Sequence, residues 1–189
     1  MNNNQPLFIL VTGLIILSLL AIFFSSDQVF KFPDWQILQE TSQVSGDIKS
    51  GIVARVVDGD TIELENKITI RYLNIDTPET KKPNTPVMCY GPEASKANKE
   101  LVEKKTVWLR SDKEDQDRYK RKLRFIFLNE QDTNDVNKSV NATLVRSGLA
   151  RVSIYKPNNT FEKDFYKLET EAKETKRGIW SACKQPFVN

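Results

Sequence analysis

Histidine is absent from the 189-residue sequence. This absence excludes histidine-ligated metal sites, Ser-His-Asp triads and a histidine general base. Any proton transfer must therefore use carboxylate, lysine or tyrosine side chains, or metal-bound water. Cysteine is nearly absent too, with two residues in the whole chain, and no internal repeat is evident.

A strong excess of charge of either sign is also missing. The chain has 28 Lys and Arg against 25 Asp and Glu, which gives a net charge of +3. Residues 1–50 hold four acids and two lysines, so the remainder carries +5. This is a modest bias towards polyanionic partners, and it does not decide the function alone.

One long hydrophobic run stands near the N-terminus. Residues 7–24 are uncharged and almost wholly apolar, and a helix of about 18 residues, roughly 27 Å long, just spans a bilayer core. We predict a membrane anchor or signal segment over residues 1–26. An uncleaved anchor is favoured because residues 1–6 hold no basic side chain. Both alternatives would carry the rest of the chain out of the cytosol, and a buried soluble helix is the remaining interpretation.

The rest of the chain divides by pattern into a linker over residues 27–50, a folded domain over 51–183 and a tail over 184–189. Alternation predicts five strands: a three-stranded meander over 52–75, with an Asp-Gly turn at Asp58, then strands over 106–109 and 122–128. Helical stripes predict three helices, capped or ended at Gly91, Gly148, Thr160 and Gly178. Such an order is typical of an α+β domain, a small closed barrel with helices packed outside.

The segment 71–80 carries the densest functional signal. It begins as a strand that is apolar on both faces, where an arginine is costly unless an anion meets it. Pro78 ends the strand ladder, so Arg71, Asp76 and Glu79 come close together at a strand end. One cation and two carboxylates at such a rim indicate a site for a metal and an anionic substrate. A buried salt bridge followed by a proline turn is the alternative.

Seven short motifs resemble, in order, one family, that of staphylococcal (micrococcal) nuclease or thermonuclease, over about residues 51–182. They are Asp58-Gly-Asp-Thr, Arg71 through Asp76-Thr-Pro-Glu-Thr80, Tyr90-Gly-Pro-Glu-Ala-Ser95, Asp117-Arg-Tyr-x-Arg121, Leu144-Val-Arg-x-Gly-Leu-Ala150, Tyr155-Lys-Pro-Asn-Asn-Thr160 and Ile179-Trp180. The resemblance implies a five-stranded OB-fold β-barrel with three packed α-helices. It also implies calcium-dependent hydrolysis of phosphodiester bonds in DNA and RNA.

The same resemblance implies a metal site. Asp60 and Asp76 would bind Ca²⁺ through their carboxylates, and the carbonyl oxygen of Thr77 would be a third ligand, with the remaining positions left to water and phosphate. Glu79 would orient or deprotonate the attacking water. Asp58 would not bind the metal itself but would support the residues that do.

Four further residues receive roles in substrate binding from the resemblance. Arg71 and Arg121 would bind the phosphate and stabilise the charge of the transition state. Tyr119 and Tyr155 would stack on the nucleotide or hydrogen-bond to it, as aromatic side chains do in single-strand grooves. We therefore expect DNA and RNA substrates with single strands preferred, and a monomeric enzyme.

The sequence departs from the family pattern at three places. Lys120 stands where the family commonly has glycine, and Ser153 stands where its best-known member has a tyrosine. Residues 129–138 form a longer polar loop than usual. None of these departures touches the predicted metal ligands or the two arginines.

The two cysteines flank the predicted helices. Cys89 comes just before the first helix and Cys183 just after the last. Two cysteines in an exported chain favour a disulfide, while two free thiols are the alternative.

Two classes of function compete on these residues. The first is a nuclease at the cell membrane, single-pass with an external catalytic domain, or secreted after cleavage. The second is a non-catalytic OB-fold module that binds nucleic acid or protein. A binding module has no need for the full set of acids and arginines, so the nuclease is favoured. The set comprises Asp60, Arg71, Asp76, Glu79 and Arg121.

Overall fold

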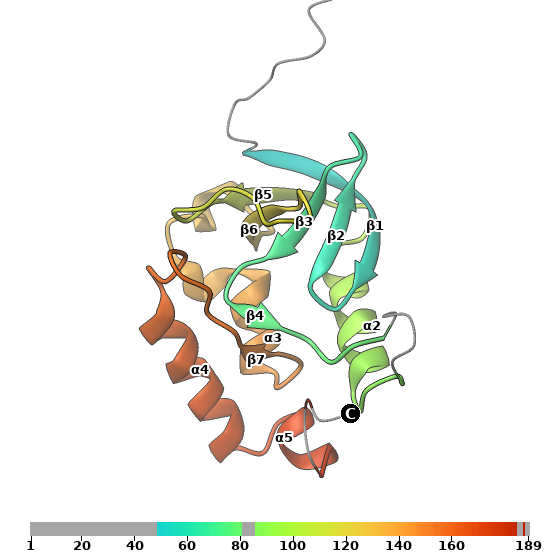
Figure 1. The fold of residues 1–189 in the computed structure, drawn as a ribbon, viewed down its shortest axis with the longest axis vertical. Coiled ribbons are helices and arrows are strands. Elements are labelled where there is room, and N and C mark those ends of the chain that lie inside the picture. Colours follow the sequence, from blue (N-terminus) through green and yellow to red (C-terminus); the bar gives the residue numbers. More distant parts are fainter. Residues whose placement is uncertain (1–48, 81–85, 185–186, 188–189) are drawn as a thin grey trace, which may run out of the picture. The chain divides into compact units, whose positions relative to one another are not determined.

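The computed structural model describes residues 49–80, 86–184 and 187 (Figure 1). The predicted membrane or signal segment and the predicted linker as far as residue 48 lie outside the described residues. Within the described part of the chain, no helix combines the length and the apolar character needed to cross a membrane.

Five strands close into a barrel, which confirms the predicted α+β fold. Neighbouring strands pair antiparallel, except that β3 and β6 run parallel. Around the barrel the strands are β1 (Ser50–Asp58), β2 (Thr61–Leu64), β3 (Thr69–Tyr72), β6 (Lys122–Phe127) and β5 (Thr106–Arg110). All five contribute buried apolar side chains to one core, among them Val53, Ile62, Ile70, Val107 and Phe125.

The third strand of the meander ends earlier than the alternation predicts. Asn74 adopts a φ of 64°, a left-handed conformation that asparagine tolerates better than most residues. The chain turns out of the barrel there and forms β4 (Ile75–Asp76), which pairs antiparallel with β7 (Arg151–Val152) in a separate two-stranded sheet (Figure 1). Asp76 therefore lies in this small sheet, below the barrel strand that carries Arg71.

The described residues include four α-helices outside the barrel: α2 (Gly91–Val102), α3 (Val140–Arg146), α4 (Glu162–Glu174) and α5 (Ile179–Ala182). The first three confirm the predicted helices, and α5 is a single additional turn. α2 packs against β1, and α3 packs against β6 and α4. The segment expected as a plain polar loop contains two 3₁₀ turns, η2 (Glu130–Asp132) and η3 (Val136–Lys138).

Two predicted helix caps are wrong. Gly91 is the first residue of α2 and Tyr90 is its N-cap. Thr160 does not cap α4, which begins at Glu162 without a side-chain cap. The Thr160 hydroxyl instead donates to Asp112 Oδ1 at 2.5 Å, because the charged carboxylate in the loop after β5 is a strong hydrogen-bond acceptor. Thr160 thus joins two loops.

The predicted stop of the long helix also differs. α4 ends at Glu174, and Gly178 is the N-cap of α5. A Cβ atom on Gly178 would lie 2.2 Å from the carbonyl oxygen of Gly148. Glycine is required at this crossing because the two backbones touch.

The sulfurs of Cys89 and Cys183 are bonded at 2.08 Å, across 94 residues of sequence. This disulfide joins the segment before α2 to the end of α5. Next to Cys89, the Met88 amide donates to the Glu79 carbonyl at 2.9 Å. The disulfide therefore anchors the chain beside Glu79.

Candidate active site

One arginine holds the two predicted acidic ligands together. Arg71 projects from β3, and its Nη1 forms an ion pair with Asp60 Oδ1 while its Nη2 lies 3.1 Å from Asp76 Oδ1. Nη2 also donates to the carbonyl of Ile75 at 3.4 Å. The structure thus places two carboxylate oxygens from separate strands and turns on one guanidinium.

Asp60 is almost completely buried, with 1% of its surface exposed. Its Oδ2 accepts hydrogen bonds from the amide and the hydroxyl of Thr77, at 2.8 and 3.0 Å, and its Oδ1 accepts one from the Thr61 hydroxyl at 3.3 Å. A Cβ atom on Gly59 would lie 2.5 Å from the Thr77 hydroxyl. The Asp-Gly-Asp turn therefore needs glycine so that Thr77 can approach Asp60 and satisfy its buried charge.

Glu79 and Asp58 lie beside this pair. Glu79 Oε1 accepts the Thr80 amide at 2.9 Å, and Asp58 Oδ1 accepts the Asp60 amide at 3.1 Å. Burial raises the pKa of Asp58 above its ordinary value, Arg71 opposes this shift, and the nearby Glu79 adds to it. The protonation of Asp58 therefore depends on the charges of Arg71 and Glu79.

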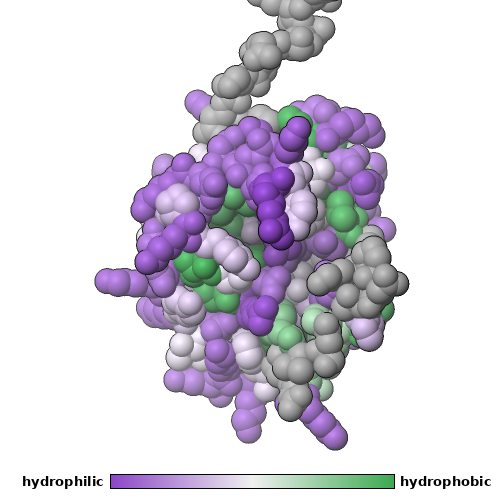
Figure 2. All heavy atoms as spheres, in the orientation of Figure 1, coloured by the Kyte–Doolittle hydropathy of each residue, from purple (hydrophilic) through white to green (hydrophobic). Residues whose placement is uncertain are grey.

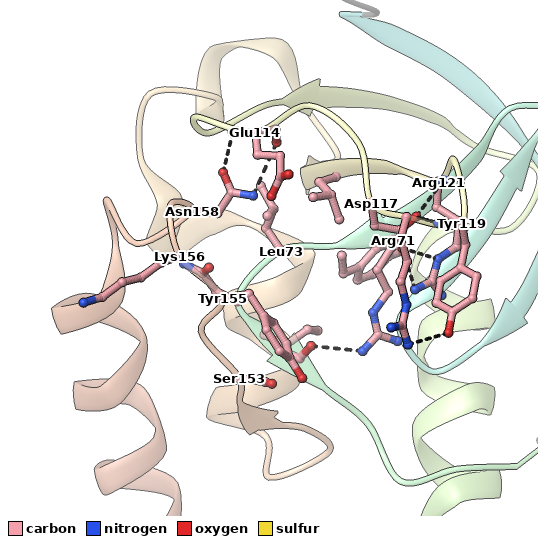
Figure 3. A pocket seen from close by; sticks show the side chains of 15 residues that line it. Arg71, Leu73, Glu114, Asp117, Tyr119, Arg121, Ser153, Tyr155, Lys156 and Asn158 are labelled. Carbon is pink, nitrogen blue, oxygen red and sulfur yellow. Dashed lines mark hydrogen bonds and ion pairs between the residues drawn. The ribbon is translucent and has the colours of Figure 1, made fainter.

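The second predicted arginine belongs to the loop between β5 and β6. Asp117 organises its last turn, because Oδ1 accepts the amides of Tyr119 and Arg121, each at 2.9 Å. Its Oδ2 accepts Arg121 Nε at 2.7 Å. The Arg121 guanidinium lies 5.5 Å from the centre of the Tyr119 ring, and that of Arg118 lies 4.8 Å from it. This local arrangement aims Arg121 at the same pocket as Arg71 (Figure 3).

A pocket connects the arginines to the second predicted tyrosine. Arg71, Arg121, Tyr119 and Tyr155 all line it, and Figure 3 shows Tyr155 on the side opposite Tyr119 and Arg121. Tyr119 is 64% exposed and Tyr155 76% exposed. Two exposed aromatic rings beside two arginines can bind a ligand that has both a planar ring and an anion.

Sequence reasoning missed the residue that joins the two walls of this pocket. The side chain of Asn158, 2% exposed, accepts the amides of Lys113 and Glu114 at 2.9 and 2.7 Å. Its amide group donates to the Glu114 carbonyl at 3.3 Å. It lies three residues after Tyr155 and holds the loop that leads to Arg121. Its place inside a recognised motif was the only available signal.

An ion pair between a buried arginine and a half-exposed aspartate, also missed, fixes the same loop. Arg124 is fully buried, its Nη2 lies 2.5 Å from Asp115 Oδ1, and Lys122 contacts the same carboxylate. Arg124 sits in the pattern of a barrel strand, where sequence alone predicts only alternation. The pair ties the loop before Arg121 to β6.

The third missed residue is Arg151 of β7. Its Nε and Nη2 lie 3.0 and 2.8 Å from Asp76 Oδ2. Together with Arg71 on Oδ1, it encloses the Asp76 carboxylate from two sides. Because β7 has two residues, it leaves no periodic signal in the sequence.

The acidic residues fit a hard cation such as Ca²⁺, because Asp60 and Asp76 already converge on one positively charged group and offer carboxylate oxygens. Thr77 meets Asp60 through its amide and hydroxyl. Among the described residues, no group of three or more acidic or cysteine side chains forms a preassembled metal cluster. A metal held here would therefore depend on water and substrate for most of its ligands.

The face of the molecule in view in Figure 2 is mostly hydrophilic, with apolar residues in separate patches. Such a surface suits a polar or charged ligand better than an apolar protein partner. The fold and the site together define a closed-barrel protein whose pocket is lined by arginine and tyrosine side chains.

The family model described as staphylococcal nuclease homologue matches residues 69–182, and the chain belongs to this family. It is 38% identical over 132 residues to the thermonuclease of Staphylococcus hyicus, and the match covers 68% of this chain and 74% of that protein. It is 32% identical over 175 residues to the thermonuclease of Staphylococcus intermedius, with 91% and 95% covered.

A further relative is the SPbeta prophage-derived endonuclease YokF of Bacillus subtilis, 48% identical over 132 residues. The match covers 67% of this chain and 42% of YokF. The chain also spans 59% of the endonuclease YncB of the same organism. These two relatives are therefore substantially longer than the part they share with this chain.

Proposed function

We propose that this protein is a nuclease that hydrolyses phosphodiester bonds of DNA and RNA with Ca²⁺ as its cofactor. The observation that carries the proposal is the meeting of Arg71 with Asp60 and Asp76 at the edge of a pocket that Arg121 also lines. The names of its relatives, thermonuclease and endonuclease, support the same reaction.

Asp60 and Asp76 would hold the Ca²⁺ ion, with the Thr77 carbonyl as a third protein ligand. When bound there, Ca²⁺ would polarise the scissile phosphate and neutralise part of its charge. Few protein ligands imply weak binding, in the range of extracellular calcium modules, about 10⁻⁴–10⁻³ M.

The two arginines and Glu79 would perform the remaining steps. Arg71 already makes charge-assisted hydrogen bonds to carboxylates and lines the pocket, so it can exchange a carboxylate oxygen for a phosphate oxygen of similar charge. Arg121, which lines the same pocket, would stabilise the charge that builds on the phosphorus oxygens. With no histidine in the chain, Glu79 is the candidate to orient the attacking water and take its proton.

The exposed rings of Tyr119 and Tyr155 would bind the nucleotide. Both rings are accessible enough to stack on an unpaired base, and such stacking favours single strands because duplex bases are already stacked. One chain contains both walls of the pocket, which is consistent with a monomer as the active species.

The test is cleavage of single-stranded DNA, duplex DNA and RNA by the purified protein, with Ca²⁺ or with the chelator EGTA. We expect Ca²⁺-dependent cleavage, fastest on single strands, with a midpoint well above micromolar Ca²⁺. The Arg121→Ala variant is the control for a contaminating nuclease. If the protein binds DNA without cutting it, and Arg121→Ala behaves identically, the non-catalytic binding module is the better function.

We further propose that the catalytic domain lies outside the cytosol, either anchored by residues 7–24 or secreted after cleavage. The apolar run supports an anchor, and the bonded cysteine pair suits an oxidising compartment. Protease added to intact cells, or to spheroplasts where an outer envelope exists, should remove an anchored domain. A domain that is protected until the membrane is lysed would refute this location and leave the chemistry untouched.

A further inference from the structure

The short sheet outside the barrel pairs an arginine with a predicted metal ligand. In the register of β4 and β7, Asp76 lies directly opposite Arg151. Two nitrogens of the Arg151 guanidinium, Nε and Nη2, share the Asp76 Oδ2 atom at 3.0 and 2.8 Å. The two residues are 75 positions apart in the sequence, so the fold builds this contact through long-range pairing.

The backbone that carries Arg151 is itself fixed from the opposite side. The amide of Val152 donates to Glu169 Oε1 of α4 at 2.8 Å. Glu169 is only 7% exposed, and its Oε2 accepts Lys173 Nζ at 2.7 Å. The Arg151 guanidinium also lies 4.2 Å from the centre of the Phe187 ring. α4 therefore holds β7, and β7 holds the arginine.

The Asp76 carboxylate would otherwise be able to rotate. Its side chain is 28% exposed, and in the described structure its Oδ1 is contacted by Arg71 Nη2 at 3.1 Å. Arg71 also contacts Asp60, so Oδ1 is the atom that faces the site. Arg151 holds Oδ2 through two nitrogens of its rigid guanidinium while Arg71 holds Oδ1, so both oxygens of the Asp76 carboxylate are fixed only when both arginines are present.

We propose that Arg151 is a positioning residue, which fixes the Asp76 carboxylate so that Oδ1 points to Asp60 and is ready for a cation. The Arg151 guanidinium contacts Asp76 Oδ2, whereas Arg71 contacts Asp76 Oδ1 on the side of Asp60, so Arg151 acts through Asp76. The statement that the oriented carboxylate binds Ca²⁺ rests on the proposed function. The statement that Arg151 orients the Asp76 carboxylate rests on the contacts alone.

Arg151 has two opposing effects on the affinity for a cation: its charge repels the cation, and its contact orients a ligand of the cation. The larger of the two decides whether Arg151 strengthens or weakens cation binding. Its positive charge repels a cation, but the side chain is 43% exposed, and solvent and salt weaken such a repulsion. Loss of a group that orients a metal ligand typically lowers metal affinity about 10- to 100-fold. Orientation should therefore outweigh repulsion.

The decisive variant is Arg151→Lys, because it keeps the charge and removes the fork of two nitrogens. The matched control is Arg55→Lys, which changes another partly exposed arginine in an ion pair, 2.6 Å from Glu63 on the barrel surface. Calcium binding to the full-length protein, solubilised in mild detergent, is measured by calorimetry without nucleic acid. We expect about tenfold weaker binding for Arg151→Lys and no change for Arg55→Lys.

Two further readouts separate positioning from a general loss of structure. The Ca²⁺ concentration for half-maximal cleavage should rise about tenfold in Arg151→Lys, while the rate at saturating Ca²⁺ recovers to within a few-fold of wild type. Thermal unfolding in EGTA should change no more than in Arg55→Lys. Unchanged or tighter calcium binding by Arg151→Lys would overturn the proposal.

A calcium-free comparison keeps this inference distinct from the proposed nuclease. Crystal structures of the wild type and Arg151→Lys, both in EGTA, would show whether the Asp76 carboxylate turns when the fork is lost. If the carboxylate keeps one orientation in both, Arg151 does not position it. If it turns in the variant but the wild type neither binds Ca²⁺ nor cuts DNA, the positioning role holds and the proposed function fails.

Discussion

Arg71 and Arg121 line one pocket, but different kinds of structure hold them. Arg71 stands on a barrel strand and is fixed by Asp60 and Asp76, which come from a hairpin turn and from a second sheet. Arg121 stands on a loop and is fixed by Asp117, four residues before it. We refer to these as the strand side and the loop side of the pocket.

The two sides also differ in the burial of their carboxylates. The Asp60 side chain is 1% exposed, whereas that of Asp117 is 18% exposed. A buried carboxylate without a counterion is costly, while a partly exposed one can be solvated. We therefore expect the strand side to depend on its arginine for stability as well as for the proposed substrate binding, and the loop side to depend on its arginine for the proposed substrate binding alone.

The Cys89–Cys183 disulfide anchors the chain beside Glu79, on the strand side of the pocket. Removing this disulfide should have the largest effect on stability. We expect the double change Cys89→Ser and Cys183→Ser to lower the free energy of unfolding by about 4 kcal/mol, because a loop of this length loses much of its unfolded-state entropy when closed. Urea unfolding measures it. Reductant should shift the wild type by the same amount and the variant by none, and alkylation of two thiols in the native protein would contradict the pairing.

The next effect compares the two arginines directly. Arg71→Ala and Arg121→Ala should each lower turnover about 10²–10³-fold, since in the proposed mechanism each change removes a charged donor to the transition state, at roughly 3–4 kcal/mol. In EGTA, Arg71→Ala should also lose about 3 kcal/mol of stability through the unpaired Asp60, whereas Arg121→Ala should lose little. Equal stability losses would show that the two sides are held alike.

The two sides of the pocket also differ in how much of their structure the sequence predicts. The Asp-Gly turn, the helices and the motif that ends at Arg121 follow from neighbours within a few residues, so local patterns predict them. The contacts of Asp76 with Arg151 join strands of two residues that are far apart in sequence. Such strands are too short to show a period, and pairing across the fold has no local signature.

Side-chain hydrogen bonds to distant backbone groups were equally unpredictable. Thr160 was expected to cap a helix and instead binds Asp112, and Asn158 gave no sign that it bridges two loops. A polar side chain can satisfy its hydrogen bonds in many ways, and only the folded chain selects one. The family resemblance supplied the predicted site residues and Asp58 beside them, but it gave no role to Asn158, Arg124 or Arg151.

Asn158 tests whether the loop side needs any long-range support. Asn158→Ala removes three hydrogen bonds from a buried position and leaves two backbone amides without their acceptor, so we expect a loss of about 2–3 kcal/mol in stability. The loop that carries Arg121 should loosen, which raises KM for single-stranded DNA more than it lowers kcat. Asn159→Ala, which removes only a contact with Lys113, is the matched control. Identical kinetics for both variants would show that Asn158 does not position the loop.

A smaller effect concerns the charge that the strand side buries beside Asp60. Asp58→Asn keeps an acceptor for the Asp60 amide and removes a carboxylate whose pKa is raised by burial. A raised pKa means that the folded state binds the proton more tightly, so stability falls as pH rises above the ordinary aspartate range near 4. In EGTA, the variant should therefore be more stable than wild type at pH 7, and the gain should vanish below about pH 4. A stability difference between Asp58→Asn and wild type that stays constant from pH 4 to pH 7 would contradict this prediction.

The smallest effect tests the local character of the loop side at Lys120. This residue has a φ of 63°, which explains why the family commonly has glycine there, since a left-handed conformation costs a non-glycine residue roughly 1–2 kcal/mol. Glycine loses more chain entropy on folding, about 0.5–1 kcal/mol. Lys120→Gly should therefore stabilise the protein by about 0.5 kcal/mol, measured by urea unfolding.

The same change removes a cation from the loop that leads to Arg121, so charge must be separated from backbone strain. Lys120→Gln removes the charge and keeps the strain. Both variants should lose affinity for single-stranded DNA equally at low salt, and the difference from wild type should shrink as salt rises, while only Lys120→Gly gains stability. If Lys120→Gly is instead destabilised, the last turn of the loop depends on the lysine side chain for its shape as well as on Asp117.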